Sequence, residues 1–454
     1  MRQSNDGMLG AMPVPRLVVT MSLPIMLSML ISAVYNLVDS VYVAQYSDEA
    51  FLALSYAYPI QMLLVAFCSG IGVGFSAIFS RRLGEGDQEQ AASAVCHGFF
   101  LYGLCWLLFL LFALTGAAPF LRLSTEDPSV ARQGAQYLLI CCGLSIGTCM
   151  QFLTERILQA IGRPAGFMIV QGSGAILNLI LDPIFIFVLD LGVAGAAAAT
   201  VIGQISGALI GFWLVYRLRH QLPIRLRGFR PRGEMLAEMG RVAAPAVVMQ
   251  SLSSFMSLGL NQLLTRWSQS AVFVLGAYFK LQTFIFMPIF GISSGLIPIL
   301  SYNYGSGALR RVSASVRFGQ QFTAVLSLSG ALLLSLLASP LLRSAFRASP
   351  EALAMGAPAL RIIALSFILA GFCIIAGSVC QAIGNPFYSL IVSVCRQLVV
   401  LLPVAWLLSQ TGNLTLVWLA FPIAELMSLT LSIIFLRKPL RMADAAMASG
   451  KAGA

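Results

Sequence analysis

The chain has 454 residues, of which 58% are hydrophobic and 10% are charged, and its mean hydropathy is +0.87. Soluble proteins carry about 25% charged residues, so this composition excludes a water-soluble enzyme, a nucleic-acid-binding module and a disordered scaffold. The net charge of +11 does not indicate a nucleic-acid partner, because the positive residues lie between apolar runs. We therefore predict an all-α integral membrane protein embedded in the lipid bilayer.

A transmembrane helix needs about 20 mostly apolar residues, and twelve such stretches follow one another along the chain. They cover residues 16–44, 52–79, 93–115, 133–158, 165–188, 193–217, 236–264, 270–300, 312–337, 352–380, 387–409 and 414–436. The first stretch is longer than the apolar part of a signal peptide and has no small-residue cleavage site at its end. We expect it to be the first transmembrane helix.

The polar segment 218–235 is the longest connection and divides the spans six and six. The predicted organisation is an N-lobe at 1–217, a cytoplasmic linker at 218–235, a C-lobe at 236–436 and a disordered cytoplasmic tail at 437–454. Most Lys and Arg residues fall in connections that lie inside when the N-terminus is cytoplasmic. The positive-inside rule therefore predicts that both termini are cytoplasmic.

The two groups of six spans are related by an internal repeat with an offset of about 220 residues. Segment 159–164 recurs as 381–386, segment 70–74 corresponds to 291–295, and Pro24 corresponds to Pro245. Because six is an even number, the two halves have the same orientation. Such a parallel pseudo-repeat of two six-helix bundles is typical of secondary transporters.

Two carboxylates stand inside the predicted spans of the N-lobe. Asp39 is in the first span with Asn36 three residues before it. Asp182 is in the fifth span with Asn178 four residues before it, so each pair shares a helix face. Ionisable groups within a membrane are costly and usually face a cavity or a partner.

Tyr137 in the fourth span and Thr200 in the sixth lie at a depth similar to that of the carboxylates, within about 9 Å at 1.5 Å per residue. Carboxylate, amide and hydroxyl oxygens together suit a hard cation such as Na⁺, and two close carboxylates also favour retention of a proton. The alternative is two isolated Asp residues at the outer interface, each hydrated by a loop. The matching C-lobe positions are Leu260 and Val404, so we expect the coupling site in the N-lobe alone.

Other charged residues also fall within or beside the spans. Arg396 and Glu425 are at equal depth on the last two spans, which indicates a buried and mainly structural ion pair. Lys280 is either a charge or gate in the central cavity or a side chain that extends outward to the interface. Glu155 and Arg156 end the fourth span and are expected at the cytoplasmic interface.

The Cys residues lie inside or at the ends of apolar stretches and form no CxxC motif. They are Cys68, Cys96, Cys105, Cys141, Cys142, Cys149, Cys373, Cys380 and Cys395. We expect them to be small apolar packing residues and predict no zinc or haem site.

These segments together resemble the MATE family, the multidrug and toxic compound extrusion transporters. The motifs that carry the resemblance are Pro24 with 35–39, 70–74 with 80–84, the repeated Gln-Ala-Ile-Gly turns, 177–183 and 298–305. The resemblance covers nearly the whole chain, and within the family the pattern is similar to DinF-like and MepA-like bacterial members. It implies two lobes arranged as a V and a cation site in the N-lobe.

By this resemblance, the N-lobe site for Na⁺ or a proton is formed by Asp39, Asn178, Asp182 and Thr200, and Tyr137 matches the tyrosine of its fourth span. NorM-like members instead use acidic residues in spans 7 and 8. This chain has Gln, Asn and Lys there and no acid, so a NorM-type site is not expected.

The function implied is antiport without a cofactor: H⁺ or Na⁺ enters while a small organic, often cationic, compound leaves. Bending near Pro24 would couple the ion to the shape of the cavity, because a proline leaves the helix ladder incomplete. We expect a monomer in the bacterial inner membrane, and not an enzyme.

Three alternatives are weaker. A flippase of a lipid-linked oligosaccharide or cell-wall precursor would favour a strongly cationic cavity, whereas this chain places an acidic pair within its spans. A major-facilitator transporter would carry a different signature in the loop at 80–87. A membrane enzyme or receptor is not supported, because no His, Ser or Cys constellation converges.

Overall fold

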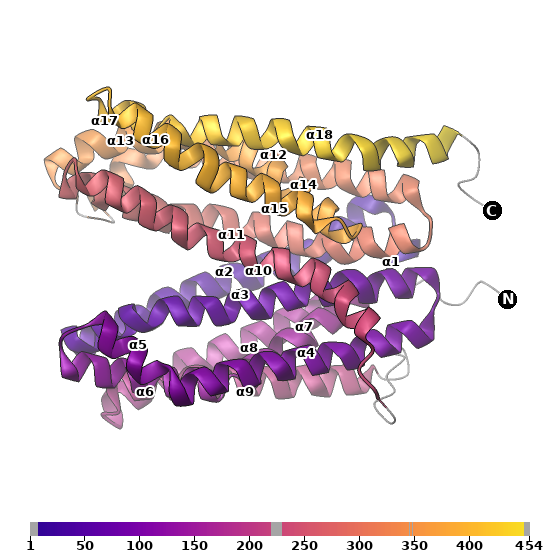
Figure 1. Cartoon of the computed structure of the whole chain (residues 1–454), viewed down its shortest axis with the longest axis horizontal. Coiled ribbons are helices and arrows are strands. Elements are labelled where there is room, and N and C mark those ends of the chain that lie inside the picture. Colours follow the sequence, from indigo (N-terminus) through magenta and orange to yellow (C-terminus); the bar gives the residue numbers. More distant parts are fainter. Residues whose placement is uncertain (1–7, 219–228, 345, 347, 449–454) are drawn as a thin grey trace. The chain divides into compact units, whose positions relative to one another are not determined.

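The computed structural model describes residues 8–218, 229–344, 346 and 348–448, and the described residues contain helices, turns and loops but no strand (Figure 1). In this part of the chain ten helices are long and apolar enough to cross a membrane. The count rises to twelve when each of two bent helix pairs is taken as one span. The predicted all-α membrane fold is thereby confirmed.

The helices of the first half are α1 (Met8–Ala11), α2 (Val14–Tyr46), α3 (Asp48–Glu85), α4 (Gln88–Thr115), α5 (Ala117–Ser124), α6 (Pro128–Gly143), α7 (Ile146–Ala160), α8 (Pro164–Pro183), the π-helical turn η1 (Ile184–Val188) and α9 (Gly192–Arg217). Those of the second half are α10 (Gly233–Thr265), α11 (Gln269–Gly305), α12 (Leu309–Ser344), α13 (Pro350–Ala364), α14 (Phe367–Ala382), α15 (Pro386–Val394), the π-helical turn η2 (Cys395–Leu401), α16 (Leu402–Ser409), α17 (Leu414–Val417) and α18 (Ala420–Ala448).

The fourth and tenth predicted spans are each bent, at equivalent places of the repeat. The axes of α6 and α7 differ by 43°, and those of α13 and α14 by 45°. At each break a serine hydroxyl donates to a backbone carbonyl three residues earlier, Ser145 to Cys142 at 2.7 Å and Ser366 to Ile363 at 2.6 Å. The backbone amide of the same serine also donates to that carbonyl, at 3.3 Å for Ser145 and 2.9 Å for Ser366, so the last turn before each break is tightened by bonds three residues apart.

The fifth and eleventh spans share a second irregularity, a π-helical turn beside a proline. The turn η1 follows Pro183 directly, and η2 ends just before Pro403. Proline has no amide hydrogen and cannot complete the α-helical ladder, which accounts for a local change to wider turns.

The contacts of the chain divide it into two compact units: Met1–Ala11 with Leu23–Val247, and Met12–Ser22 with Val248–Ala454. The division falls inside α2 and α10, beside the equivalent prolines of the repeat. Within the first unit, Arg82 of α3 pairs with Glu238 of α10 at 2.7 Å. Within the second, Arg311 donates to the Met12 carbonyl at 2.8 Å. The predicted lobe boundaries at 217 and 236 stay a prediction, because residues 219–228 lie outside the described part.

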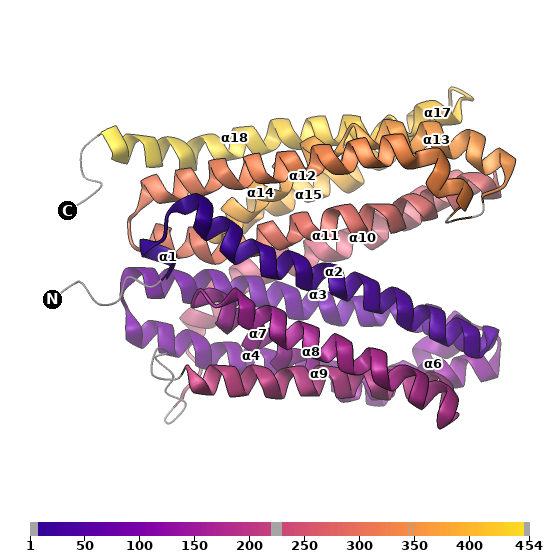
Figure 2. The ribbon, with the colours of Figure 1, turned by 180° about the vertical axis from the view of Figure 1, so that it is seen from behind.

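Each unit has its own apolar core. In the first, α9 packs along α7 and α8 (Figure 2), and α3 packs against α4 and α6 around fully buried Phe75 and Tyr102. In the second, α14 contacts α11, α12 and α18, with Phe367 and Trp418 buried. The core of the first unit also includes Met235 and Met239 of α10, so it extends beyond the helices of the first half.

The C-terminal prediction of a disordered tail at 437–454 is wrong for most of its length, because α18 continues to Ala448. The segment is rich in Ala and Met, which have high helix propensity. Residues 449–454 lie outside the described part.

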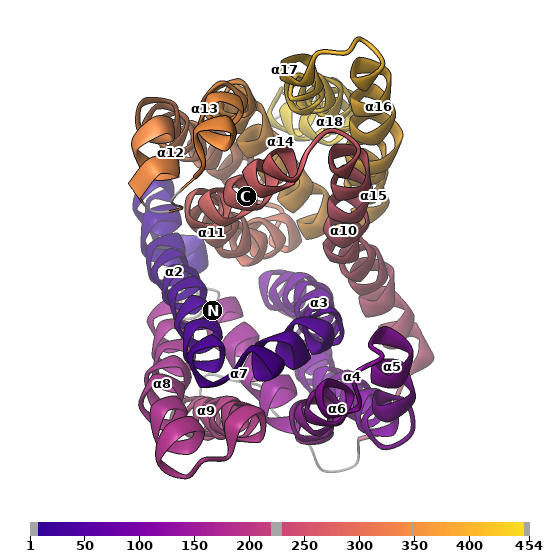
Figure 3. The same cartoon turned by 90° about the vertical axis from the view of Figure 1, so that its left-hand side faces the viewer.

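The contact between α8 and α9, which lie side by side in the end-on view of Figure 3, depends on two glycines. A Cβ atom on Gly203 would lie 2.7 Å from the Gly174 carbonyl oxygen, and one on Gly174 would lie 2.9 Å from that of Gly203. Both obstructing atoms belong to the backbone and cannot turn aside. Small residues at such crossings let membrane helices approach closely.

Gly203→Ala is therefore expected to destabilise the first unit by about 1–3 kcal/mol, the usual cost of overpacking. The control is Gly172→Ala on α8, where an added Cβ meets no atom within 4 Å. Thermal unfolding of the purified variants checks this, with Gly203→Ala lower in its midpoint and Gly172→Ala unchanged or higher. Equal midpoints would contradict the close packing.

Candidate functional site

The helices α8 and α9 bring three predicted site residues into direct contact. The Asn178 amide donates to Asp182 Oδ1 at 3.0 Å and faces Thr200 Oγ1 at 3.4 Å. Asp182 is 0% exposed, Asn178 3% and Thr200 7%. Asn178 and Asp182 are one helical turn apart on α8, so the same face presents both side chains to α9.

The second carboxylate comes from α2. The carboxyl group of Asp39, 9% exposed, lies within hydrogen-bonding reach of Asp182. Ionised carboxylates have only acceptor atoms, so this contact is a hydrogen bond only when one of the two groups holds a proton. The pair is thus suited to hold one proton or to share a cation.

Three buried carboxylate and amide oxygen atoms at this site receive no hydrogen bond from any donor in the described ranges. They are Asp39 Oδ1, Asn178 Oδ1 and Asp182 Oδ2. Buried polar atoms without a partner are rare in proteins and indicate an ion, water or functional group at the site. Carboxylate and amide oxygens are also the ligands that hard cations prefer.

Tyr137 extends the site from α6. Its side chain is fully buried, within electrostatic range of Asp39 and beside Gln61 and Cys141. Gln61 of α3 was not singled out in the sequence, because one glutamine in an apolar stretch carries no signal of its tertiary neighbours.

Other predicted site residues lie elsewhere. Asn36 is exposed, and its amide donates to the Ser32 carbonyl at 2.8 Å. Pro24 is inside α2, where its carbonyl accepts from Ser28 at 2.9 Å. Lys280 is exposed on α11, in the second unit.

Glu155 and Arg156, which we expected at the cytoplasmic interface, lie near the end of α7 and are enclosed by protein; their depth in the membrane stays a prediction. Both are buried in α7, with exposures of 1% and 5%. Gln151 donates to Glu155 at 2.9 Å, and Arg156 donates to Gln159 at 3.0 Å. The bend between α6 and α7 and the packing of α7 on α3, α4 and α9 explain the burial, because neighbouring helices cover this end of the span.

The predicted ion pair of the second half is present. Arg396 Nη1 lies 3.0 Å from Glu425 Oε1, with side-chain exposures of 25% and 13%. Arg396 lies within η2 and Glu425 within α18. The π-helical turn therefore carries the cation of this pair.

The chain is similar to a family of membrane transporters. The MatE family model matches residues 24–184 and 245–407. The multidrug export protein MepA of Staphylococcus aureus (strain MRSA252) is 29% identical over 299 residues, which span 65% of this chain and only 65% of MepA. The FAD transporter of Shewanella oneidensis is 25% identical over 441 residues, 94% of each chain.

Among solved structures, an outward-facing multidrug resistance transporter of the MATE family, from the MOP superfamily, superposes with a TM-score of 0.92. The two chains are 23% identical, and the match covers 98% of this chain and 100% of the other. At this level of identity the similarity shows a shared fold.

Proposed function

The chain belongs to the MATE family of multi-pass membrane transporters, and from this premise we propose that it is an efflux antiporter. It exports small organic, cationic compounds in exchange for inward H⁺ or Na⁺. The observation that carries the proposal is the buried pair of Asp39 and Asp182, whose neighbouring oxygens have no donor among the described residues. We also propose that it works without a cofactor as a monomer in the bacterial inner membrane, with both termini cytoplasmic.

Efflux is coupled to ion entry because the substrate and the ion compete for the negative charge of the Asp39 and Asp182 pair. When the pair is ionised, it attracts a cationic substrate or Na⁺, because an uncompensated charge within a bilayer is costly. A proton or Na⁺ arriving from outside neutralises the pair and removes the attraction for the substrate. Ion and substrate therefore occupy the carboxylates alternately, and bending of α2 at Pro24 would transmit the change.

Efflux from proteoliposomes tests this function. A fluorescent organic cation is loaded, and H⁺ and Na⁺ gradients are imposed separately. We expect one gradient to accelerate efflux above that of protein-free liposomes. FAD is tested in parallel, because one relative that aligns over nearly the whole chain is named as an FAD transporter.

Two other outcomes of this efflux measurement would refute the substrate class or the antiport mechanism. Gradient-driven export of FAD without the cation would refute the cationic substrate class but retain antiport. No response to either gradient would contradict the antiporter proposal and favour the alternative of a flippase for a lipid-linked oligosaccharide or cell-wall precursor. Lipid-linked substrates would then be assayed.

A further inference from the structure

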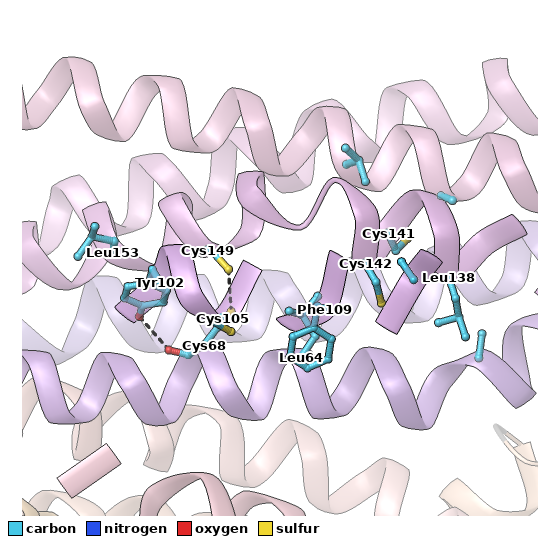
Figure 4. Packing of buried hydrophobic residues seen from close by; sticks show 14 of the residues in the cluster. Leu64, Cys68, Tyr102, Cys105, Phe109, Leu138, Cys141, Cys142, Cys149 and Leu153 are labelled. Carbon is cyan, nitrogen blue, oxygen red and sulfur yellow. Dashed lines mark hydrogen bonds between the residues drawn. The ribbon is translucent and has the colours of Figure 1, made fainter. Parts of the chain in front are cut away.

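Three cysteines that are far apart in the sequence meet in the core of the first unit. Cys68 lies on α3, Cys105 on α4 and Cys149 on α7, and their three sulfur atoms all lie within 4.8 Å of one another. Figure 4 shows them at one level of the bundle, between Tyr102 and Phe109. The exposures are 0%, 4% and 0%, respectively.

The spacing of the sulfur atoms differs from that of a disulfide. Cys68 Sγ and Cys149 Sγ are 3.7 Å apart, whereas a disulfide bond is about 2.05 Å long. All three cysteines are free thiols. Three sulfur ligands about 2.3 Å from a common atom would be about 4 Å apart in a planar arrangement and about 3.4 Å apart in a pyramidal one, so the cluster needs only small adjustments to hold one central atom.

The number of ligands and the charge restrict that atom. Structural zinc takes four ligands, and this group offers three among the described residues. Soft thiolates select soft ions. Three thiolates around Cu⁺ would carry two negative charges and around Zn²⁺ one, which is costly in an apolar core. Three thiolates around a trivalent centre are neutral.

We propose that Cys68, Cys105 and Cys149 form a binding site for a trivalent thiophilic metalloid, arsenite or antimonite. The reaction is As(OH)₃ + 3 R–SH → As(SR)₃ + 3 H₂O. Three As–O bonds break and three As–S bonds form, each thiol proton leaves on a hydroxide as water, and no atom changes its oxidation state. Both the incoming As(OH)₃ and the product are uncharged, so neither places a net charge in the apolar core.

The bound atom would join three helices. The Tyr102 hydroxyl already donates to the Cys68 carbonyl at 2.8 Å and connects α4 to α3. An arsenic or antimony atom bonded to all three sulfur atoms would also connect α7, through Cys149, to α3 and α4. Binding is therefore expected to raise the unfolding temperature, because a ligand that binds only the folded state stabilises it.

The test uses the purified full chain kept reduced and incubated with arsenite. After removal of free arsenite, elemental mass spectrometry is expected to find one arsenic per chain, with a sulfur-to-arsenic absorption band and a higher unfolding midpoint. Cys68→Ala, Cys105→Ala and Cys149→Ala should each lose at least about 100-fold in affinity, since even loss of an outer-shell partner costs about 10- to 100-fold.

Cys141→Ala and Cys142→Ala are matched controls, because both thiols are buried in the same core but are not in the cluster. They should keep the bound arsenic. The proposal is overturned if the reduced wild-type chain binds no arsenic, if Cys105→Ala binds it as tightly as the wild type, or if the controls lose it equally. Binding of Cu⁺ by these cysteines without binding of arsenite would also overturn it, because the charge argument would then have failed.

Discussion

Asp39→Asn is expected to reduce ion-driven efflux to the level of protein-free liposomes while the protein still inserts and folds. The amide can donate to Asp182, so it reproduces the hydrogen bond of the half-protonated pair but cannot exchange a proton. Asp182 can still bind a proton, but the variant lacks the second carboxylate with which the pair holds the ion. Asp182→Asn is expected to act in the same way, because each carboxyl group lies within hydrogen-bonding reach of the other.

The measurement is gradient-driven efflux from proteoliposomes containing equal amounts of each variant. Glu49→Gln is the control, because Glu49 is an exposed acid whose carboxylate accepts from Ser129 at 2.7 Å. It should transport like the wild type. Normal efflux by Asp39→Asn would refute the coupling role of the pair, whereas loss of efflux in Glu49→Gln as well would mean that the assay reports general damage.

The second large effect concerns the stability of the second unit. Glu425→Gln is expected to destabilise it by roughly 3 kcal/mol, because Arg396 would keep its charge in a mostly buried position without its counterion. Glu425 is the carboxylate that the described residues place against Arg396, and its second oxygen, Oε2, has no described hydrogen-bond donor.

A double substitution distinguishes the cost of leaving one charge unpaired from the cost of losing the pair itself. Arg396→Met with Glu425→Gln should recover most of the lost stability, because removing both charges of a buried pair is often nearly neutral. Unfolding midpoints of the single and double variants provide the measurement. Arg361→Gln, which alters an exposed arginine of α13, should have little effect. If the single Glu425→Gln variant is as stable as the wild type, the pair is not a structural element.

The sequence indicated the candidate site through composition and spacing. In an apolar chain an acid inside a span is rare, so Asp39 and Asp182 stood out, and helical periodicity placed Asn178 on the same face as Asp182. What the sequence could not give was contact between helices. Gln61 beside Tyr137 depends on how α3 packs against α6, which no local pattern encodes.

The burial of Glu155 and Arg156 and the meeting of three cysteines, neither of which the sequence indicated, have the same origin. Glu155 and Arg156 were placed at the interface by counting residues along a straight span. The bend between α6 and α7 and the covering helices bury them. The cysteines were interpreted one by one as apolar packing, although three of them meet only after α3, α4 and α7 assemble.

The sequence by itself determined the membrane class, the number of spans and the duplicated halves. Each of these follows from the bilayer's requirement for about 20 apolar residues per helix and from a repeat that can be read along one dimension. Only the tertiary structure decided which polar groups share a buried environment. Helix bends, glycine contacts such as that of Gly174 with Gly203 and the rotation of each helix set those distances, and they depend on side chains from segments far apart in the chain.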